Sequence, residues 1–158
     1  MPIKTWDKSD LLPKIDSKEY KELLSDLERN VKTIESYKDK LKPNISIKDF
    51  MKIINALEFI SGIRARLDSY AYMWFSEDTS SQEAKSFRAK IDQLTVDVSN
   101  RIMFFSLWFT KSLDDKNADR LIEEADKEYK YYLEFKRKAK KHLLSESEEK
   151  VINLKDIT

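Results

Sequence analysis

The only histidine of the 158-residue chain, His142, lies in a stretch that also holds lysines and carboxylates, "KAKKHLLSESEE" (residues 138–149). Histidine is a frequent metal ligand and changes its charge near neutral pH, so this stretch is the first candidate for a metal or catalytic centre. A helical zinc-peptidase site needs two histidines one turn apart with a glutamate between them, H-E-x-x-H. Leu143 follows the histidine here, and the sequence has no second histidine.

Other catalytic patterns are also incomplete around His142. A di-iron bundle needs glutamate three residues before the histidine, whereas Ala139 stands there. The sequence has no cysteine, no G-x-S-x-G segment and no P-loop. Adjacent carboxylates in polar surroundings indicate the surface: Glu123 with Glu124, and Asp114 with Asp115. We therefore expect no catalytic residue and no metal ligand in this chain, and we expect His142 to bond the last carbonyls of a helix.

A basic run, "KRKAKKH" (Lys136 to His142), holds five Lys or Arg in its first six residues and allows nucleic-acid binding as one interpretation. However, residues 114–158 hold twelve Asp or Glu against eleven Lys or Arg. Cations in the last turn of a helix also complement its dipole. We favour a solvated helix end.

The overall charge gives no reason to expect a nucleic acid or a membrane as partner. Thirty basic and twenty-nine acidic side chains leave a net charge of +1. The start of the chain lacks the apolar core of a signal peptide, and no apolar run approaches the roughly 20 residues that span a bilayer. The absence of cysteine fits a reducing compartment. We expect a cytoplasmic protein.

The low content of glycine and proline, with one Gly and three Pro, predicts an all-α fold. Apolar residues recur at helical spacing over four ranges, and Ser17, Ser46 and Ser81 stand at helix starts. The expected helices are 17–41, 46–74, 81–111 and 118–141, with a short fifth begun by the S-x-x-E box of Ser145 and Glu148. Residues 1–158 are read as a single domain of four to five helices. Long antiparallel, coiled-coil-like hairpins carry shorter packing helices. Gly62 interrupts the second range, where we expect close helix packing.

The most informative feature is aromatic. The stretch "IMFFSLWF" (residues 102–109) is apolar on all sides of a helix, and "YAYMWF" (residues 70–75) repeats this pattern. A helix that is apolar all round must be buried on several sides. We therefore expect an interdomain or oligomer contact here, with another domain or a second copy of the chain. The candidate contact residues are Met103, Phe104, Leu107 and Trp108.

Four stretches, taken in order, resemble the oligoendopeptidase F family of thimet oligopeptidase-like zinc metallopeptidases. "TWDKSDLLP" (residues 5–13) resembles the family's opening T-W-D-L-x-x-L. "YAYMWFSEDTSSQEAKSF" (residues 70–87) resembles Y-A-x-M-x-x-S-E-D-T, and "FFSLWF" (residues 104–109) is similar to the aromatic helix end that follows. "YKYYLEFKRKAKKHLLSESEEKV" (residues 129–151) is similar to Y-x-x-Y-L-E…H-x-L-S-x-x-E-E. The family usually has R-x-P-H before the L-S, where this chain has Lys140, Lys141 and His142, so the fourth helix is expected to run further.

The resemblance implies a helical N-terminal domain that forms one wall of a deep substrate channel. It also implies that the zinc, its H-E-x-x-H helix and peptide hydrolysis belong to a C-terminal catalytic domain, which this chain lacks. The expected partners are that domain and short peptide substrates, with zinc only in the parent enzyme. The alternative is a stand-alone helical interaction module that forms homo-oligomers through Phe104 and Trp108. A third hypothesis is nucleic-acid binding through Lys136 to Lys141.

Overall fold

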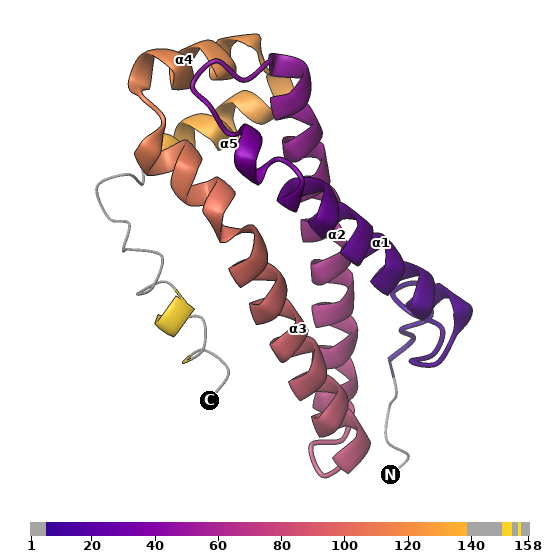
Figure 1. Ribbon diagram of the computed structural model, residues 1–158. Coiled ribbons are helices and arrows are strands. Elements are labelled where there is room, and N and C mark those ends of the chain that lie inside the picture. Colours follow the sequence, from indigo (N-terminus) through magenta and orange to yellow (C-terminus); the bar gives the residue numbers. More distant parts are fainter. Residues whose placement is uncertain (1–5, 139–149, 153–154, 156–158) are drawn as a thin grey trace.

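The computed structural model describes residues 6–138, 150–152 and 155. Among these residues every regular element is a helix, so the predicted all-α fold is confirmed (Figure 1). The elements are α1 (Lys18–Glu35), the 3₁₀ turn η1 (Lys38–Lys40), α2 (Ile47–Glu77), α3 (Gln82–Leu107), the π-helical turn η2 (Trp108–Ser112), α4 (Asp115–Glu124) and α5 (Lys127–Lys138). No helix in this described part of the chain combines the length and apolarity that crossing a membrane requires.

The first four α-helices begin where the local sequence supplies a side-chain cap. In each case a side-chain oxygen accepts a hydrogen bond from the backbone N–H three residues later, at 3.0 to 3.2 Å. This bond satisfies one of the amides that a helix start leaves without a partner. The caps are Ser17, Ser46, Ser81 and Asp114. The three predicted serine caps are therefore confirmed.

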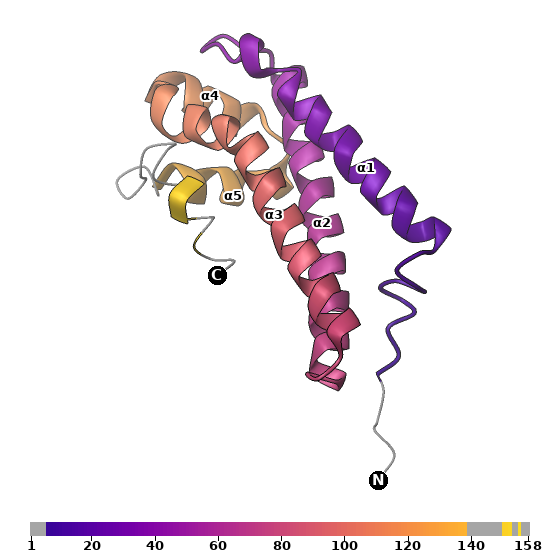
Figure 2. The ribbon, with the colours of Figure 1, turned by 60° about the horizontal axis from the view of Figure 1, so that its bottom comes forward.

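A long antiparallel hairpin of α2 and α3 forms the frame of the molecule, as predicted. At 1.5 Å per residue, the 31 residues of α2 extend about 46 Å. Helix α1 packs against both arms, and α4 and α5 lie across the end of the hairpin that is distant from the α2–α3 connection (Figures 1 and 2). The end of α3 is therefore enclosed by elements from much of the chain.

Aromatic side chains fill the core at both ends of the hairpin. Near the α2–α3 connection, the Phe87 ring lies 5.7 Å from those of both Tyr70 and Trp74. At the other end, the Phe50 ring lies 5.5 Å from that of Phe109 and 6.0 Å from that of Phe105. These rings join α2 to α3 through large buried apolar areas.

The first helix is shorter than predicted: α1 ends at Glu35, not near Leu41. The backbone tightens there, because the Tyr37 N–H bonds to the Ile34 carbonyl, three residues back, at 3.0 Å. The Ser36 hydroxyl also donates to the Thr33 carbonyl at 2.7 Å, which satisfies a free carbonyl of the last turn. Leu41 belongs to the connection that follows η1.

The predicted fourth helix, 118–141, is wrong as one element, because the chain breaks it into α4 and α5 at Ala125. The Ala125 backbone is extended, with ψ of 156°, and its side chain is buried. The apolar spacing continues through the break, since Leu121 and Leu133 are both buried. The break turns α5 back across the hairpin end. The predicted helix begun by Ser145 and Glu148 lies outside the described residues.

The prediction of close helix packing at Gly62 is also wrong. A Cβ atom built on Gly62 meets no heavy atom within 4 Å. The glycine is exposed, as is the neighbouring Phe59. No contact within the described structure therefore requires a glycine at this position.

Candidate functional site

The apolar side chains of residues 102–109 lie on three different sides of the helix at the end of α3. Phe105 and Phe109 face the core, where their exposed fractions are 4% and 2%. Phe104 and Trp108, four residues apart, lie together on a second side. Met103 and Leu107, also four residues apart, lie on a third. All four predicted contact residues are half-buried, so the structure distributes them over two sides.

The side with Phe104 and Trp108 is partly covered by the protein itself. Both rings pack against the core, with the Trp108 ring centroid 5.9 Å from that of Phe105. The Lys38 ammonium from η1 lies 5.5 Å from the centroid of the Phe104 ring. A cation over an aromatic face is attracted by the ring quadrupole. Much of the apolar surface that the sequence assigned to an external contact is thus used internally.

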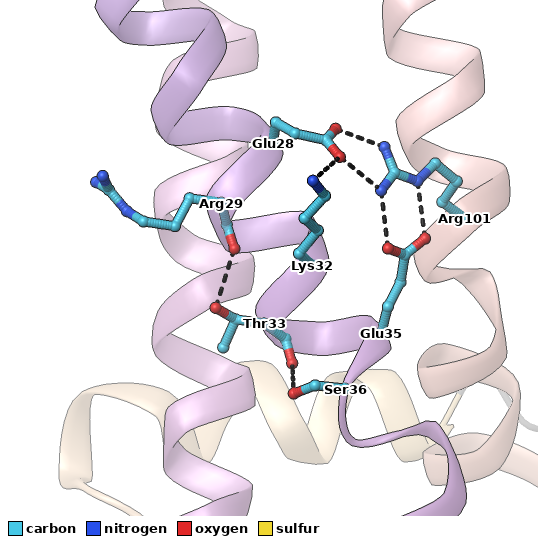
Figure 3. A network of polar contacts seen from close by, with 7 residues as sticks. All are labelled: Glu28, Arg29, Lys32, Thr33, Glu35, Ser36 and Arg101. Atoms are coloured by element: carbon cyan, nitrogen blue, oxygen red, sulfur yellow. Dashed lines mark hydrogen bonds and ion pairs between the residues drawn. The ribbon is translucent and has the colours of Figure 1, made fainter.

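Arg101 lies one turn before Phe104 and ties α3 to α1 (Figure 3). Its guanidinium contacts Glu35 through Nε···Oε1 and Nη2···Oε2, both 2.8 Å. It also contacts Glu28 through Nη1···Oε2 at 2.6 Å and Nη2···Oε1 at 3.1 Å. These hydrogen bonds lower the pKa of both carboxyls and raise the pKa of Arg101. Two forked carboxylate contacts on one guanidinium indicate a structural clamp.

The side with Met103 and Leu107 borders a cavity of about 410 Å³ between α2, α3, η2 and α5. We call it the α3–α5 cavity. Its volume lies in the range of small-molecule sites. The apolar lining is Ile54, Leu57, Ile102, Met103, Phe105, Leu107, Phe109, Tyr132 and Leu133. The polar lining is Ser61, Arg64, Ser99, Ser106, Thr110 and Lys136.

The charges of the α3–α5 cavity are all of one sign. Arg64 from α2 and Lys136 from α5 line it, and no carboxylate does so among the described residues. Neither cation has a carboxylate partner within ion-pair distance in that part of the chain, although Asp68 lies near Arg64. The Arg64 Nε atom is buried without a hydrogen-bond partner, and burial lowers the pKa of this guanidinium. Lys136 lies over the Tyr132 ring, 5.5 Å from its centroid.

The end of the cavity is held by the π-helical turn η2 and by Arg137. The Thr110 hydroxyl donates to the Ser106 carbonyl at 2.6 Å. Arg137 donates from Nη1 to the carbonyls of Phe109, Leu113 and Thr110 at 2.6, 3.1 and 3.3 Å, and from Nη2 to Asp115. Wider π turns leave carbonyls without helical partners, and a guanidinium suits several of them at once. Arg137 therefore fixes α5 against the end of α3.

A smaller hollow of about 210 Å³ continues the cavity along α2 and α5. It shares Ser61 and Tyr132 with the larger one and is bounded by Glu58 and Tyr129. The Tyr129 hydroxyl donates to Glu58 at 2.5 Å, and this bond raises the pKa of Tyr129 to about 12. The carboxylate at this end is thus already hydrogen-bonded within the protein.

Several residues of this region were missed by the sequence-based prediction. Arg64 was not singled out, and Lys136 was named only as part of the basic run. The two come from distant helices, and no local pattern relates them. Tyr131 and Phe135 on α5 are 79% and 59% exposed, and their four-residue spacing within "YKYYLEF" was a usable signal for an aromatic surface. His142 lies outside the described residues.

The residues that the structure describes form no zinc site. The sequence holds one histidine and no cysteine, which are the usual nitrogen and sulfur ligands of zinc. Across residues 6–138, 150–152 and 155, no group of three His, Cys, Asp or Glu side chains is placed to hold a metal ion. No step of metal chemistry can therefore be assigned to these residues.

Comparison with known proteins gives one match. No curated protein and no solved structure matches the chain. A family model described as oligopeptidase F, of the N-terminal type, matches residues 110–158, about a third of the chain. This segment begins within η2 and includes α4 and α5, and α5 lines one side of the α3–α5 cavity. The predicted resemblance to the N-terminal domain of the oligopeptidase F family is thus confirmed over residues 110–158.

Proposed function

We propose that the chain is the substrate-access domain of a zinc-dependent oligoendopeptidase that cleaves short peptides. The family match over residues 110–158 carries this proposal. In the whole enzyme the zinc and its H-E-x-x-H helix belong to a separate catalytic domain. The helical domain forms one wall of the channel that leads to it and limits entry to short, unfolded peptides.

The architecture supports this role in two ways. The hairpin of α2 and α3 is a long, rigid element, about 46 Å along α2. The matched segment packs across one end of it through Arg137 and through the Tyr129–Glu58 hydrogen bond. A channel wall needs such rigidity, because a yielding wall would not reject folded proteins.

The test begins with the reading frame after Thr158. We expect it to continue into an H-E-x-x-H segment. The full product should hydrolyse fluorogenic peptides of about ten residues in a zinc-dependent manner and leave folded proteins intact. The 158-residue chain alone should not cleave these peptides with or without added zinc.

The largest peptide that the enzyme accepts distinguishes a domain that controls substrate access from one that does not. A full-length enzyme with Arg137→Met, which loosens α5 from α3, should accept longer peptides or lose activity toward all of them. Lys138→Met, on the same helix but exposed, is the matched control and should keep the wild-type size limit. A stop codon at the end of this sequence, or zinc-dependent hydrolysis by the 158-residue chain, contradicts the proposal.

A stand-alone interaction module remains the second candidate, and one observation favours it. Tyr131 and Phe135 project from the same face of α5 and are 79% and 59% exposed. Exposed aromatic pairs are typical of protein contact surfaces. A natural stop codon after Thr158, together with a partner that binds wild type but not Tyr131→Ser with Phe135→Ser, would favour this function.

A further inference from the structure

We propose that the α3–α5 cavity is a binding site for a small amphipathic carboxylate, a single carboxylate group attached to an apolar chain. The Arg64 guanidinium and the Lys136 ammonium receive the carboxylate, and the apolar walls receive the chain. This site is independent of peptide hydrolysis, because it needs neither zinc nor a catalytic domain.

The first argument is charge complementarity. Arg64 and Lys136 line one cavity, and neither has a carboxylate within ion-pair distance among the residues that the structure describes. Arg101 and Arg137, by contrast, each make four hydrogen bonds to oxygen acceptors in that part of the chain. Partly buried cations without a paired anion are costly unless a ligand neutralises them. Asp68 near Arg64 and the Tyr132 ring beside Lys136 offset these charges only in part, so a carboxylate ligand would still gain from both cations.

The second argument is the buried donor of Arg64. Its Nε atom is shielded from solvent and has no hydrogen-bond partner. Most buried polar atoms in proteins are hydrogen-bonded, so an exception needs an explanation. A carboxylate suits it, because a planar guanidinium contacts both oxygens of a carboxylate at once. Lys136 adds a second positive charge from the opposite helix.

The third argument is the shape and chemistry of the walls. The cavity holds about 410 Å³, and nine of its fifteen lining residues are apolar or aromatic. The hydroxyls of Ser61, Ser99, Ser106 and Thr110 are the other polar groups. A phosphate or a sugar would leave the apolar walls unused, whereas an uncharged apolar molecule would form no ion pair with Arg64 or Lys136. An amphipathic carboxylate uses both the apolar walls and the two cations.

Decanoate is the probe, with the 158-residue chain observed by NMR and calorimetry. We expect saturable binding with shifts of the methyl groups of Met103, Leu107 and Leu57. Acetate, which lacks the chain, and decan-1-ol, which lacks the charge, should each bind at least about tenfold more weakly, since a charge-assisted hydrogen bond is worth about that factor. Decan-1-ol binding as tight as decanoate overturns the role of the cations.

Two single variants locate the site. Arg64→Gln and Lys136→Gln should each weaken decanoate binding about tenfold, for the same reason. Lys127→Gln, an exposed cation at the other end of α5, is the matched control and should bind like wild type. Circular dichroism and thermal unfolding establish that each variant is folded. If both cavity variants are folded and bind normally, or if wild type shows no binding at millimolar decanoate, the proposal is wrong.

The carboxylate has two possible sources, a fatty acid or the C-terminus of a hydrophobic peptide. Acetyl-leucyl-leucine with a free carboxylate, compared with its C-terminal amide, separates them. A peptide acid that binds more tightly than decanoate identifies a peptide terminus, and tighter decanoate binding identifies a fatty acid. In either case the amide should lose the Arg64-dependent part of the affinity.

Discussion

Arg101 on α3 and Glu35 on α1 form a two-pronged ion pair, with Nε···Oε1 and Nη2···Oε2 both 2.8 Å. The same guanidinium also bonds Glu28, two helical turns before Glu35 on α1. One side chain of α3 therefore contacts α1 at two points (Figure 3). The three side chains are 34% to 45% exposed, so solvent weakens each pair. The geometry makes this clamp stronger than a simple surface pair.

Replacing Arg101 with methionine should reduce the free energy of unfolding by about 1 to 2 kcal/mol. The change removes four hydrogen bonds and leaves Glu28 and Glu35 close together without a cation. Arg29→Met is the matched control, since Arg29 pairs with Asp26 on the surface and points away from the clamp (Figure 3). Its effect should be near zero. Urea unfolding followed by circular dichroism measures both, and equal effects would show that the clamp adds nothing.

The clamp should also make stability depend on pH in the acidic range. The hydrogen bonds from Arg101 hold the pKa of Glu28 and of Glu35 below the ordinary glutamate value of 4.5. The unfolded chain therefore binds protons before the folded one does, so the stabilisation is present above about pH 4.5 and is lost as pH falls through the folded pKa. Asp68 changes the stability in the opposite direction with pH, because burial raises its pKa. Subtracting the pH profile of the stability of Arg101→Met from that of wild type removes the contribution of Asp68. Identical pH profiles for wild type and variant would contradict the prediction.

The sequence predicted helix starts better than helix ends. Ser17, Ser46 and Ser81 cap helices through bonds to residues three positions away, so the information is local. The break at Ala125 was missed although Asp126, a residue type that favours helix starts, directly precedes α5, because buried Leu121 and Leu133 continue the apolar spacing across it. The contacts that hold α5 after the break are tertiary: Arg137 reaches the carbonyls of Phe109 in η2 and of Leu113, which follows it.

Gly62→Ala should stabilise the protein by about 1 kcal/mol, the difference in helix propensity between the two residues. Nothing lies within 4 Å of the added methyl group, and the position is in the interior of α2. Ala65→Gly, exposed one turn later on the same helix, is the reverse control and should destabilise by a similar amount. Chemical unfolding measures both. Destabilisation by Gly62→Ala would mean that this face is packed against something in the native protein.

Arg137→Met should reduce the free energy of unfolding by about 2 to 3 kcal/mol, because it leaves the carbonyls of Phe109, Thr110 and Leu113 without their charged donor. The Arg137 side chain is only 11% exposed, unlike the side chains of the Arg101 clamp. Arg137→Lys should recover part of the loss, since an ammonium reaches fewer carbonyls than a guanidinium fork. Lys138→Met, exposed at the next position, should change little. An Arg137→Met protein as stable as wild type would exclude Arg137 as the tether of α5.

The candidate site could be predicted only in part from the sequence. The apolar character on all sides of residues 102–109 predicted an external contact through Met103, Phe104, Leu107 and Trp108, and that contact stays a prediction. It did not separate the side that packs under Lys38 from the side that borders the cavity, since both depend on elements distant in the chain. Arg64 was not singled out for the same reason, and Lys136 was named only as part of a basic run that allowed nucleic-acid binding. Two cations on separate helices acquire a joint meaning only when the fold brings them to one cavity.

The sequence predicts that Met103, Phe104, Leu107 and Trp108 contact another domain or a second copy of the chain. Leu107 is half-buried at the cavity, so a second copy or a catalytic domain that docks here must cover it. We expect the isolated chain to self-associate with increasing concentration in sedimentation velocity, and Leu107→Gln to abolish the association by placing an amide in an apolar contact. Leu24→Gln, another half-buried leucine on α1, is the control and should associate like wild type. Decanoate should compete with association, because both use the Leu107 side of α3. A chain that stays monomeric at every concentration contradicts the oligomer contact.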